Sequence, residues 1–319
     1  MNLSQIRQDA DYRLQQNDGS FSKLILFHTA ITAGASVLLM LVNWLSQYIT
    51  PGGGLSNMDA QNLLSTGQVL LQLLITIATP LWEAGLIYCT LQLIKNRSCT
   101  ADNLPEGFRR WGPVASSLVI RGLIYFAVCI GCYFLTSLVI SFIPFSPSIL
   151  ADLAAFIEAP TLPLSDGVRT FLLVLCVAYI ASLCVLLIPK LYLHRLVVYR
   201  IVDDAPCGGL QAVLHSRILM KGHRKTLLLL DLSFWWFYLL EFCIGLLSIG
   251  YLFLSGLGIA LPISTKAAAW LFPLSALLAR IALYWFAKPK LAISYALFYQ
   301  EIFEQSLKEP ELPQPPQMP

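Results

Sequence analysis

The sequence predicts an all-α polytopic membrane protein with six transmembrane helices. Of the 319 residues, 57% are hydrophobic and only 12% are charged, whereas soluble domains carry about 25% charged residues. The mean hydropathy of +0.68 agrees with this deficit of charge. Six apolar runs are each long enough to cross a bilayer, which takes about 20 residues. The polar N-terminal stretch has no small-residue cleavage site after a short apolar core, so we expect no cleaved signal peptide.

The six runs define one membrane domain over residues 1–305. They lie at residues 24–45, 59–79, 116–143, 168–188, 226–247 and 266–287. The second run is the weakest at its start, because Asn62, Ser65 and Gln68 interrupt its apolar residues. The chain ends in several prolines without an apolar period. We therefore expect residues 306–319 to form a disordered, Pro-rich cytoplasmic tail.

The distribution of Lys and Arg predicts how the chain is oriented. The connections 48–59 and 144–167 contain neither residue, and the fifth connection offers only Lys266. The connections 95–110 and 190–225 are rich in both. Because Lys and Arg are retained on the cytoplasmic side, we expect both termini and these two basic connections in the cytoplasm of a multi-pass cell-membrane protein. Reporter fusions that place residues 190–225 outside would contradict this orientation.

Prolines and short amphipathic stretches suggest an internal repeat. Pro80, Pro189 and Pro289 follow the second, fourth and sixth runs, where a proline favours a bend into a surface helix. Short amphipathic stretches precede the odd runs, and the third stretch carries apolar residues at helical spacing, namely Leu210, Val213, Leu214 and Ile218. Such spacing beside basic residues is typical of a helix in the membrane interface, which we expect to end at Gly222. The predicted repeats are residues 1–100, 101–202 and 203–305, in one common orientation. Coincidence is the alternative, since prolines are common near the ends of spans.

Basic residues surround the start of the fifth run. The set comprises Arg217, Lys221, Arg224 and Lys225. Basic residues beside a span attract anionic lipid headgroups by about 1 kcal/mol each. The simpler alternative is that they only fix the topology.

Ionisable residues within the runs are further candidates, because they are costly in lipid. Asp231 lies about 9 Å beyond Lys225, and Arg280 lies about 12 Å from Lys288 at the rise of an α-helix. These matching depths predict an Asp231–Arg280 pair that locks helix packing, with a polar path for a substrate or proton as the alternative. Glu241 is deeper and has no certain partner.

Two more charged residues lie near the ends of runs. Arg121 lies near the inner end of the third run. We expect its side chain to extend so that the guanidinium group reaches the membrane–water interface. Glu83 lies at the cytoplasmic interface if the second span stops near Pro80, and inside the bilayer if the helix runs straight on to Lys95.

Four short motifs resemble one family of bacterial membrane proteins. The motifs are Ile218-Leu219-Met220-Lys221-Gly222 followed by Leu230-Asp231-Leu232-Ser233-Phe234 and aromatic residues, Pro80-Leu81 with Gly85, Leu104-Pro105-Glu106-Gly107-Phe108, and Ala296-Leu297-Phe298-Tyr299-Gln300-Glu301. Together they are similar to the signature of the domain-of-unknown-function family nine-seven-five. The resemblance covers nearly the whole chain.

The resemblance implies a topology and a cell-membrane location but no chemistry. The Trp that usually follows the Lys-Gly dipeptide is replaced here by Arg224 and Lys225, and the connection 144–167 does not fit the pattern. A weaker similarity is to the membrane domain attached to some glycerophosphodiester phosphodiesterases. That similarity implies phospholipid contact by analogy only.

No residue pattern predicts a metal, a cofactor or a reaction. Most of the eight Cys lie in apolar runs, where Cys behaves as a small hydrophobe, and no loop-borne set indicates disulfides. Cys129 and Cys132 form a CxxC inside the third run, where a redox pair would lack access. The four His lack an accompanying carboxylate cluster, and the net charge of +3 does not support binding to nucleic acid. A hydrolase elbow, a Walker loop and paired carboxylates on a soluble face are absent from the sequence, which disfavours an enzyme.

The sequence therefore favours a non-enzymatic scaffold or assembly factor. It would engage anionic lipids of the cytoplasmic leaflet, or a membrane protein partner, through its surface helices. The alternative is a transporter whose path is lined by Asp231, Glu241 and Arg280.

Overall fold

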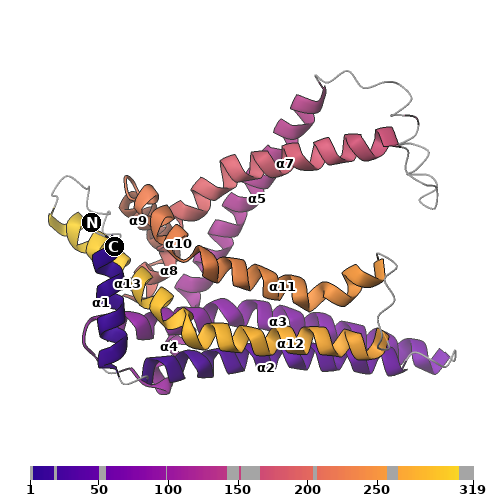
Figure 1. The fold of residues 1–319 in the computed structure, drawn as a ribbon, viewed down its shortest axis with the longest axis horizontal. Coiled ribbons are helices and arrows are strands. Elements are labelled where there is room, and N and C mark those ends of the chain that lie inside the picture. The colour runs from indigo at the N-terminus through magenta and orange to yellow at the C-terminus, as the bar shows by residue number, and fades with distance from the viewer. Residues whose placement is uncertain are drawn as a thin grey trace. The chain divides into compact units, whose positions relative to one another are not determined.

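The computed structural model describes residues 3–17, 20–49, 55–97, 99–141, 151, 166–203, 207–256 and 265–308. Every regular element in this part of the chain is helical, which confirms the all-α prediction (Figure 1). In chain order the elements are α1 (Leu3–Gln16), α2 (Ser20–Ile49), α3 (Leu55–Ile94), the 3-10 turn η1 (Ala101–Asn103), α4 (Glu106–Arg109), α5 (Trp111–Ser141), α7 (Asp166–Leu193), α8 (Val197–Val202), α9 (Gly209–Leu219), α10 (Arg224–Ser233), α11 (Trp235–Gly256), α12 (Thr265–Phe286) and α13 (Lys288–Lys308). The connection 152–165 and the predicted tail beyond Lys308 lie outside the described residues.

Four to six stretches of these helices can cross a membrane. Four qualify alone by length and hydropathy: Ser20–Val42, Ser65–Ile94, Trp111–Val139 and Asp166–Val202. Two further pairs qualify only together, α10 with α11 and α12 with α13, and these pairs are bent by 64° and 50°. These four stretches overlap the first four predicted runs.

The contacts divide the chain into two compact units. Unit 1 comprises Met1–Val114, Val198–Gly208 and Lys225–Pro319, and unit 2 comprises Ala115–Val197 and Gly209–Arg224. In unit 1, α2 packs along α3, α12 packs on α2, and α11 packs on α12. Figure 1 shows α2, α3 and α12 running side by side. α13 leaves this bundle at the bend and packs on α1 and α3.

A small core lies where α1 and α13 meet the bundle of unit 1. Its buried side chains come from four helices and the turn before α4, and they are Ala10, Phe21, Leu24, Ile25, Leu86, Cys89, Leu104 and Ile293. Burying such side chains stabilises a fold by roughly 1.5–3 kcal/mol each for the larger ones. This core fixes α1 and α13 against one end of the spanning helices, where most of the charged contacts described below are found.

Two glycines allow the turn before α4 to approach the backbone of α3. A Cβ atom on Gly85 would lie 1.8 Å from the carbonyl oxygen of Leu104. A Cβ atom on Gly107 would lie 1.9 Å from the carbonyl oxygen of Leu81. The absence of a side chain at both positions is therefore what permits this contact.

Unit 2 is built from α5, α7 and α9. The hydroxyls of Thr136 on α5 and Ser182 on α7 lie 3.3 Å apart. Ser216 on α9 donates a hydrogen bond of 2.7 Å to the carbonyl oxygen of Leu193, at the end of α7. α9 is thus fixed to the same end of α7 that carries Lys190. Cys132 is buried and unpaired on α5, as expected for a packing residue.

The structure corrects the prediction that a surface helix begins after each proline. α3 runs through Pro80 to Ile94, and α7 runs through Pro189 to Leu193. A proline removes one backbone donor, but buried neighbours such as Leu81 and Ala84 hold α3 in place. Only the third predicted repeat bends at the expected place, between α12 and α13. The three repeats themselves stay a prediction.

Two further features were not predicted. The fifth run is carried by α10 and α11, which qualify as a span only together and meet at a 64° bend after Ser233. The prediction that the chain has no disulfide is wrong, because Cys89 and Cys99 form one. Their Cα atoms are 5.5 Å apart. Cys89 lies near the end of α3 and Cys99 lies in the segment that returns along it, a proximity that spacing alone did not indicate.

Candidate functional site

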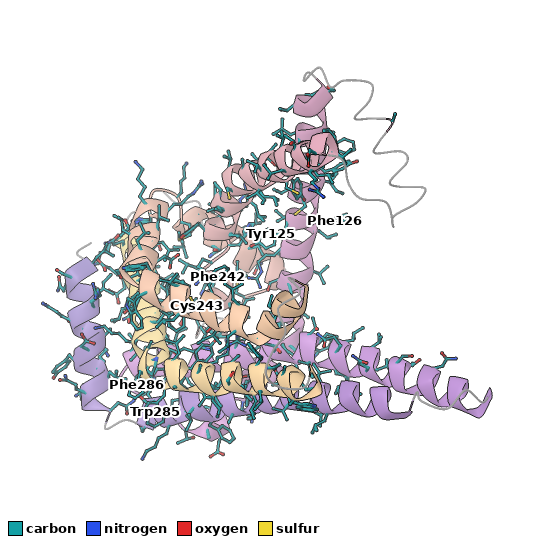
Figure 2. All side chains as sticks on the ribbon, turned by 45° about the vertical axis from the view of Figure 1, so that its right-hand side comes forward. Tyr125, Phe126, Phe242, Cys243, Trp285 and Phe286 are labelled. Carbon is teal, nitrogen blue, oxygen red and sulfur yellow. A yellow bond between two sulfur atoms is a disulfide. The ribbon has the colours of Figure 1, made fainter. Side chains whose placement is uncertain are left out.

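An ion pair joins α11 and α12 in unit 1. The Nε atom of Arg280 lies 2.8 Å from Oε1 of Glu241, and the Tyr284 hydroxyl donates to the same oxygen at 3.3 Å. The side chains of Glu241 and Arg280 are 28% and 41% exposed. Figure 2 labels Phe242 and Cys243, which follow Glu241 on α11, and Trp285 and Phe286 at the end of α12. Glu241 is the one charged residue of α11, and Arg280 shares α12 with only one other charged residue, Lys266 near the start of the helix.

The polar contact continues along α12 toward α13. Tyr284 stacks on Phe237 of α11, and Lys288 places its Nζ atom 4.2 Å from the centroid of the Tyr284 ring. Arg280 and Tyr284 are four residues apart and share one face of α12, whereas Lys288 begins α13 after the 50° bend. Lys288 also lies within the electrostatic influence of Glu83 on α3 and of Glu241. Four charges of both signs are thus gathered at one end of this bundle.

The predicted pair of Asp231 and Arg280 is wrong. Asp231 instead accepts a hydrogen bond from Tyr295 on α13, and a second one from Tyr238 at 3.4 Å. The depth estimate assumed a straight helix from Lys225, whereas Asp231 lies in α10, before the 64° bend. Glu241 had no predicted partner. It pairs with Arg280 because Glu241 lies after the bend, on α11, which packs along α12.

Glu83 lies on α3, and Arg121 lies on α5. α3 continues as one helix past Glu83 to Ile94, and the Glu83 side chain is exposed. Arg121 donates from Nε to the carbonyl oxygen of Ser117 at 3.3 Å, one turn nearer the start of α5. Its side chain therefore extends toward the helix end, as we expect for a charge that reaches for the interface.

A second charged network, around Asp203, was not predicted. Oδ1 of Asp203 lies 2.6 Å from Nζ of Lys95, and Oδ2 accepts a hydrogen bond of 2.8 Å from the Tyr299 hydroxyl. Nη1 of Arg110 donates to the carbonyl oxygens of Asp203 and Ile201, both at 2.8 Å. The Asp203 side chain is only 9% exposed. The network therefore connects α3, α4, the segment after α8, and α13 within unit 1.

Aromatic side chains adjoin this network, and a separate ion pair joins α13 to α1. Tyr199 lies against Tyr299 with ring centroids 5.6 Å apart, and Arg200 lies over the ring of Phe303 at 5.2 Å. Lys290 on α13 pairs with Asp11 on α1 at 2.6 Å. In the sequence, the network was indicated only by the family-like motif that contains Tyr299. Asp203 lies just after the end of a helix, where no periodic pattern of residues points to it.

The predicted basic residues lie on an exposed surface. Arg217, Lys221, Arg224 and Lys225 are all exposed. Within the described residues, none of the four takes part in an ion pair. Gly222 has a φ of 92° and follows the end of α9. A left-handed residue at this position commonly terminates a helix, and glycine adopts it without strain. The predicted stop at Gly222 is confirmed.

The apolar stripe predicted on α9 is divided between two faces. Val213 is buried together with Ala212, Ser216 and Leu219. Leu210, Leu214 and Ile218, each four residues apart, are 52%, 46% and 38% exposed. Arg217 follows Leu214 by three residues, so it borders the exposed apolar face of α9, and Lys221 lies in the turn just after the helix ends. α9 therefore buries one face and presents apolar and basic side chains on the other.

The part of the chain that the structure describes contains no group of three or more His, Cys, Asp or Glu side chains that could hold a metal ion. The two networks are instead made of ion pairs and of Tyr hydroxyls that donate to carboxylates. Such contacts can position helices.

Comparisons with known proteins identify one family. Neither the curated proteins nor the solved structures that were compared contain a match to this chain. The profile of the family described as "Protein of unknown function (DUF975)" matches residues 1–306. Because this match covers nearly the whole chain, the protein belongs to that family.

Proposed function

We propose that this protein is a non-enzymatic protein of the cell membrane that binds anionic lipid headgroups of the cytoplasmic leaflet through α9 and the turn into α10. This contact makes it a scaffold or assembly factor at the membrane surface. The observation that carries the proposal is the exposed face of α9, where large apolar side chains and basic side chains alternate.

The two faces of α9 support an interfacial position. A soluble helix of this kind would bury its apolar stripe, yet Leu210, Leu214 and Ile218 remain exposed while the other face is buried. An interfacial helix inserts such a stripe between lipid headgroups and keeps its basic residues at phosphate level. The hydrogen bond from Ser216 to Leu193 holds α9 at the basic end of α7. That end is cytoplasmic if Lys and Arg follow their usual distribution.

Removing two of these charges tests the proposal. The double substitution Arg217→Gln and Lys221→Gln is expected to weaken retention of phosphatidylglycerol roughly thirtyfold, since each charge contributes about 1 kcal/mol. The measurement is native mass spectrometry of the full chain, titrated with phosphatidylglycerol or phosphatidylcholine in a mild detergent. Binding of phosphatidylcholine should not change.

A matched control is available in the same unit. Arg169→Gln removes one exposed positive charge at the other end of α7, where Arg169 pairs only weakly with Asp166 at 3.4 Å. This variant should keep the affinity for phosphatidylglycerol. An equal loss in the control, or no loss in the double variant, would show that α9 does not bind anionic lipid.

A transporter is the second candidate function, and the Glu241–Arg280 pair favours it. Ionisable residues within spans often line substrate or proton paths. The alternative role of the pair is to lock α11 against α12, which agrees with the scaffold proposal.

The two roles predict different effects of Glu241→Gln. If the pair locks packing, this variant leaves Arg280 without its counter-charge, and the free energy of unfolding should fall by about 2 kcal/mol, less than for a fully buried pair because both side chains are partly exposed. Adding Arg280→Gln should then recover part of the loss. Scanning fluorimetry of the purified variants measures this. A variant that keeps its unfolding temperature but loses solute uptake in cells would instead support the transporter.

A further inference from the structure

A polar stripe runs along the membrane-spanning part of α3. Its residues are spaced by three or four positions and comprise Ser65, Gln68, Gln72, Thr76, Thr79 and Glu83. The average spacing equals the 3.6-residue turn of an α-helix, so the six side chains share one face. From first to last they cover about 27 Å, close to the roughly 30 Å of a bilayer's hydrocarbon core.

The hydroxyls in this polar stripe are satisfied by the helix itself. Thr76 and Thr79 each donate a hydrogen bond of 2.7 Å to the carbonyl oxygen four residues earlier. Ser65 donates at 2.9 Å to the carbonyl oxygen of Asn62. These side chains can therefore face an apolar environment at little cost.

The two glutamines are different. Gln72 is exposed and Gln68 is half-buried, and neither side-chain amide has a hydrogen-bond partner among the described residues. An unpaired amide in hydrocarbon costs several kcal/mol, because lipid tails offer neither donor nor acceptor. An open hollow of about 760 Å³ lies against this face of α3, and its described lining includes both glutamines together with Val69, Leu73 and Ile77. The face therefore has room for another helix and requires a polar partner.

We propose that a second copy of this chain covers the polar stripe, so that the protein forms a parallel dimer through α3. A carboxamide is both a donor and an acceptor, so the stripe is complementary to itself. Two copies inserted with the same topology are related by a twofold axis along the membrane normal, which places each glutamine opposite its equivalent at the same depth. The middle of the stripe is neutral and does not call for a charged partner. Side-chain amides are known to join helices inside membranes in this way.

Site-specific photocrosslinking tests the dimer in the native membrane. A photoreactive benzoylphenylalanine at Gln72 is expected to join two copies of the full chain. The same group at Leu74 is the control, since Leu74 is 63% exposed on the same helix but is turned about 200° from Gln72. It should give no dimer. A product of Gln72 within one chain, with a different protein, or with lipid alone would overturn the proposal.

The glutamines can also be tested by their effect on association. Gln68→Leu combined with Gln72→Leu is expected to raise the dimer dissociation constant in liposomes roughly tenfold. Single-molecule photobleaching at several protein-to-lipid ratios measures this constant. The control, Leu70→Ala with Leu74→Ala, should leave it unchanged, and size-exclusion chromatography shows whether each variant is folded. An unchanged constant in the folded glutamine variant, or a monomeric unsubstituted protein at every ratio, would overturn the proposal.

Discussion

Gly85→Ala is expected to destabilise the protein by about 3 kcal/mol, and Gly107→Ala by a similar amount. The new Cβ atoms would lie 1.8 Å from the carbonyl oxygen of Leu104 and 1.9 Å from that of Leu81. Both obstructing atoms belong to the backbone, so no flexible side chain can move aside. α3 and the turn before α4 would have to separate, which exposes the core that contains Leu86 and Leu104.

A third glycine provides the control on the same helix. A Cβ atom on Gly67 would have no neighbouring atom within 4 Å, so Gly67→Ala should leave stability unchanged or raise it by up to about 1 kcal/mol through helix propensity. Thermal unfolding in detergent, followed by scanning fluorimetry, compares the three variants. If Gly85→Ala unfolds at the same temperature as the unsubstituted protein, the close approach of the two segments is not a feature of the fold.

These glycines show what the sequence indicated and what it did not. The motif around Pro80, Leu81 and Gly85 and the motif at residues 104–108 were both visible in the sequence. Their contact was not, because a glycine needed for close approach looks the same as one needed for a turn. In the structure, Gly85 of the first motif lies against the carbonyl oxygen of Leu104 in the second. Gly107 of the second motif lies against the carbonyl oxygen of Leu81 in the first.

The spans were predictable because the bilayer fixes how many apolar residues a helix needs. The bend between α10 and α11 was not, since no Gly or Pro lies near it. It coincides with three-residue backbone hydrogen bonds from Phe234 to Asp231 and from Phe237 to Phe234. Phe234 is 2% exposed and lies under Arg7 of α1. A contact with a distant helix marks the bend, and such a contact leaves no periodic pattern in the sequence.

That bend also explains the error at the candidate site. A depth calculated from helical rise is valid only along one axis. Asp231 lies before the bend and meets Tyr295, whereas Glu241 lies after it and meets Arg280. The prediction identified the ionisable residues of the fifth and sixth runs but assigned the wrong carboxylate to Arg280.

Asp203→Asn is expected to lower the free energy of unfolding by about 3 kcal/mol. The substitution keeps the shape of the side chain but removes the charge opposite Lys95, 2.6 Å away. It also replaces one carboxylate oxygen, so the Tyr299 hydroxyl loses either its acceptor or the strength of a charge-assisted bond. Lys95 is 26% exposed, and partial solvation keeps the effect below the upper end of the range for buried pairs. Denaturant or thermal unfolding of the purified variant measures the loss.

A double-mutant cycle with Lys95→Met separates the ion pair from the other contacts of Asp203. If the pair accounts for much of the loss, Asp203→Asn should cost less in the Lys95→Met background, with a coupling energy of about 1–3 kcal/mol. Asp166→Asn, which removes a carboxylate that is 97% exposed, should leave stability unchanged. Additive effects of the first two substitutions would contradict a direct pair. Lys95, Arg110 and Tyr299 belong to three different predicted repeats. A large coupling would therefore show that the Asp203–Lys95 pair stabilises the contact between the first and third predicted repeats.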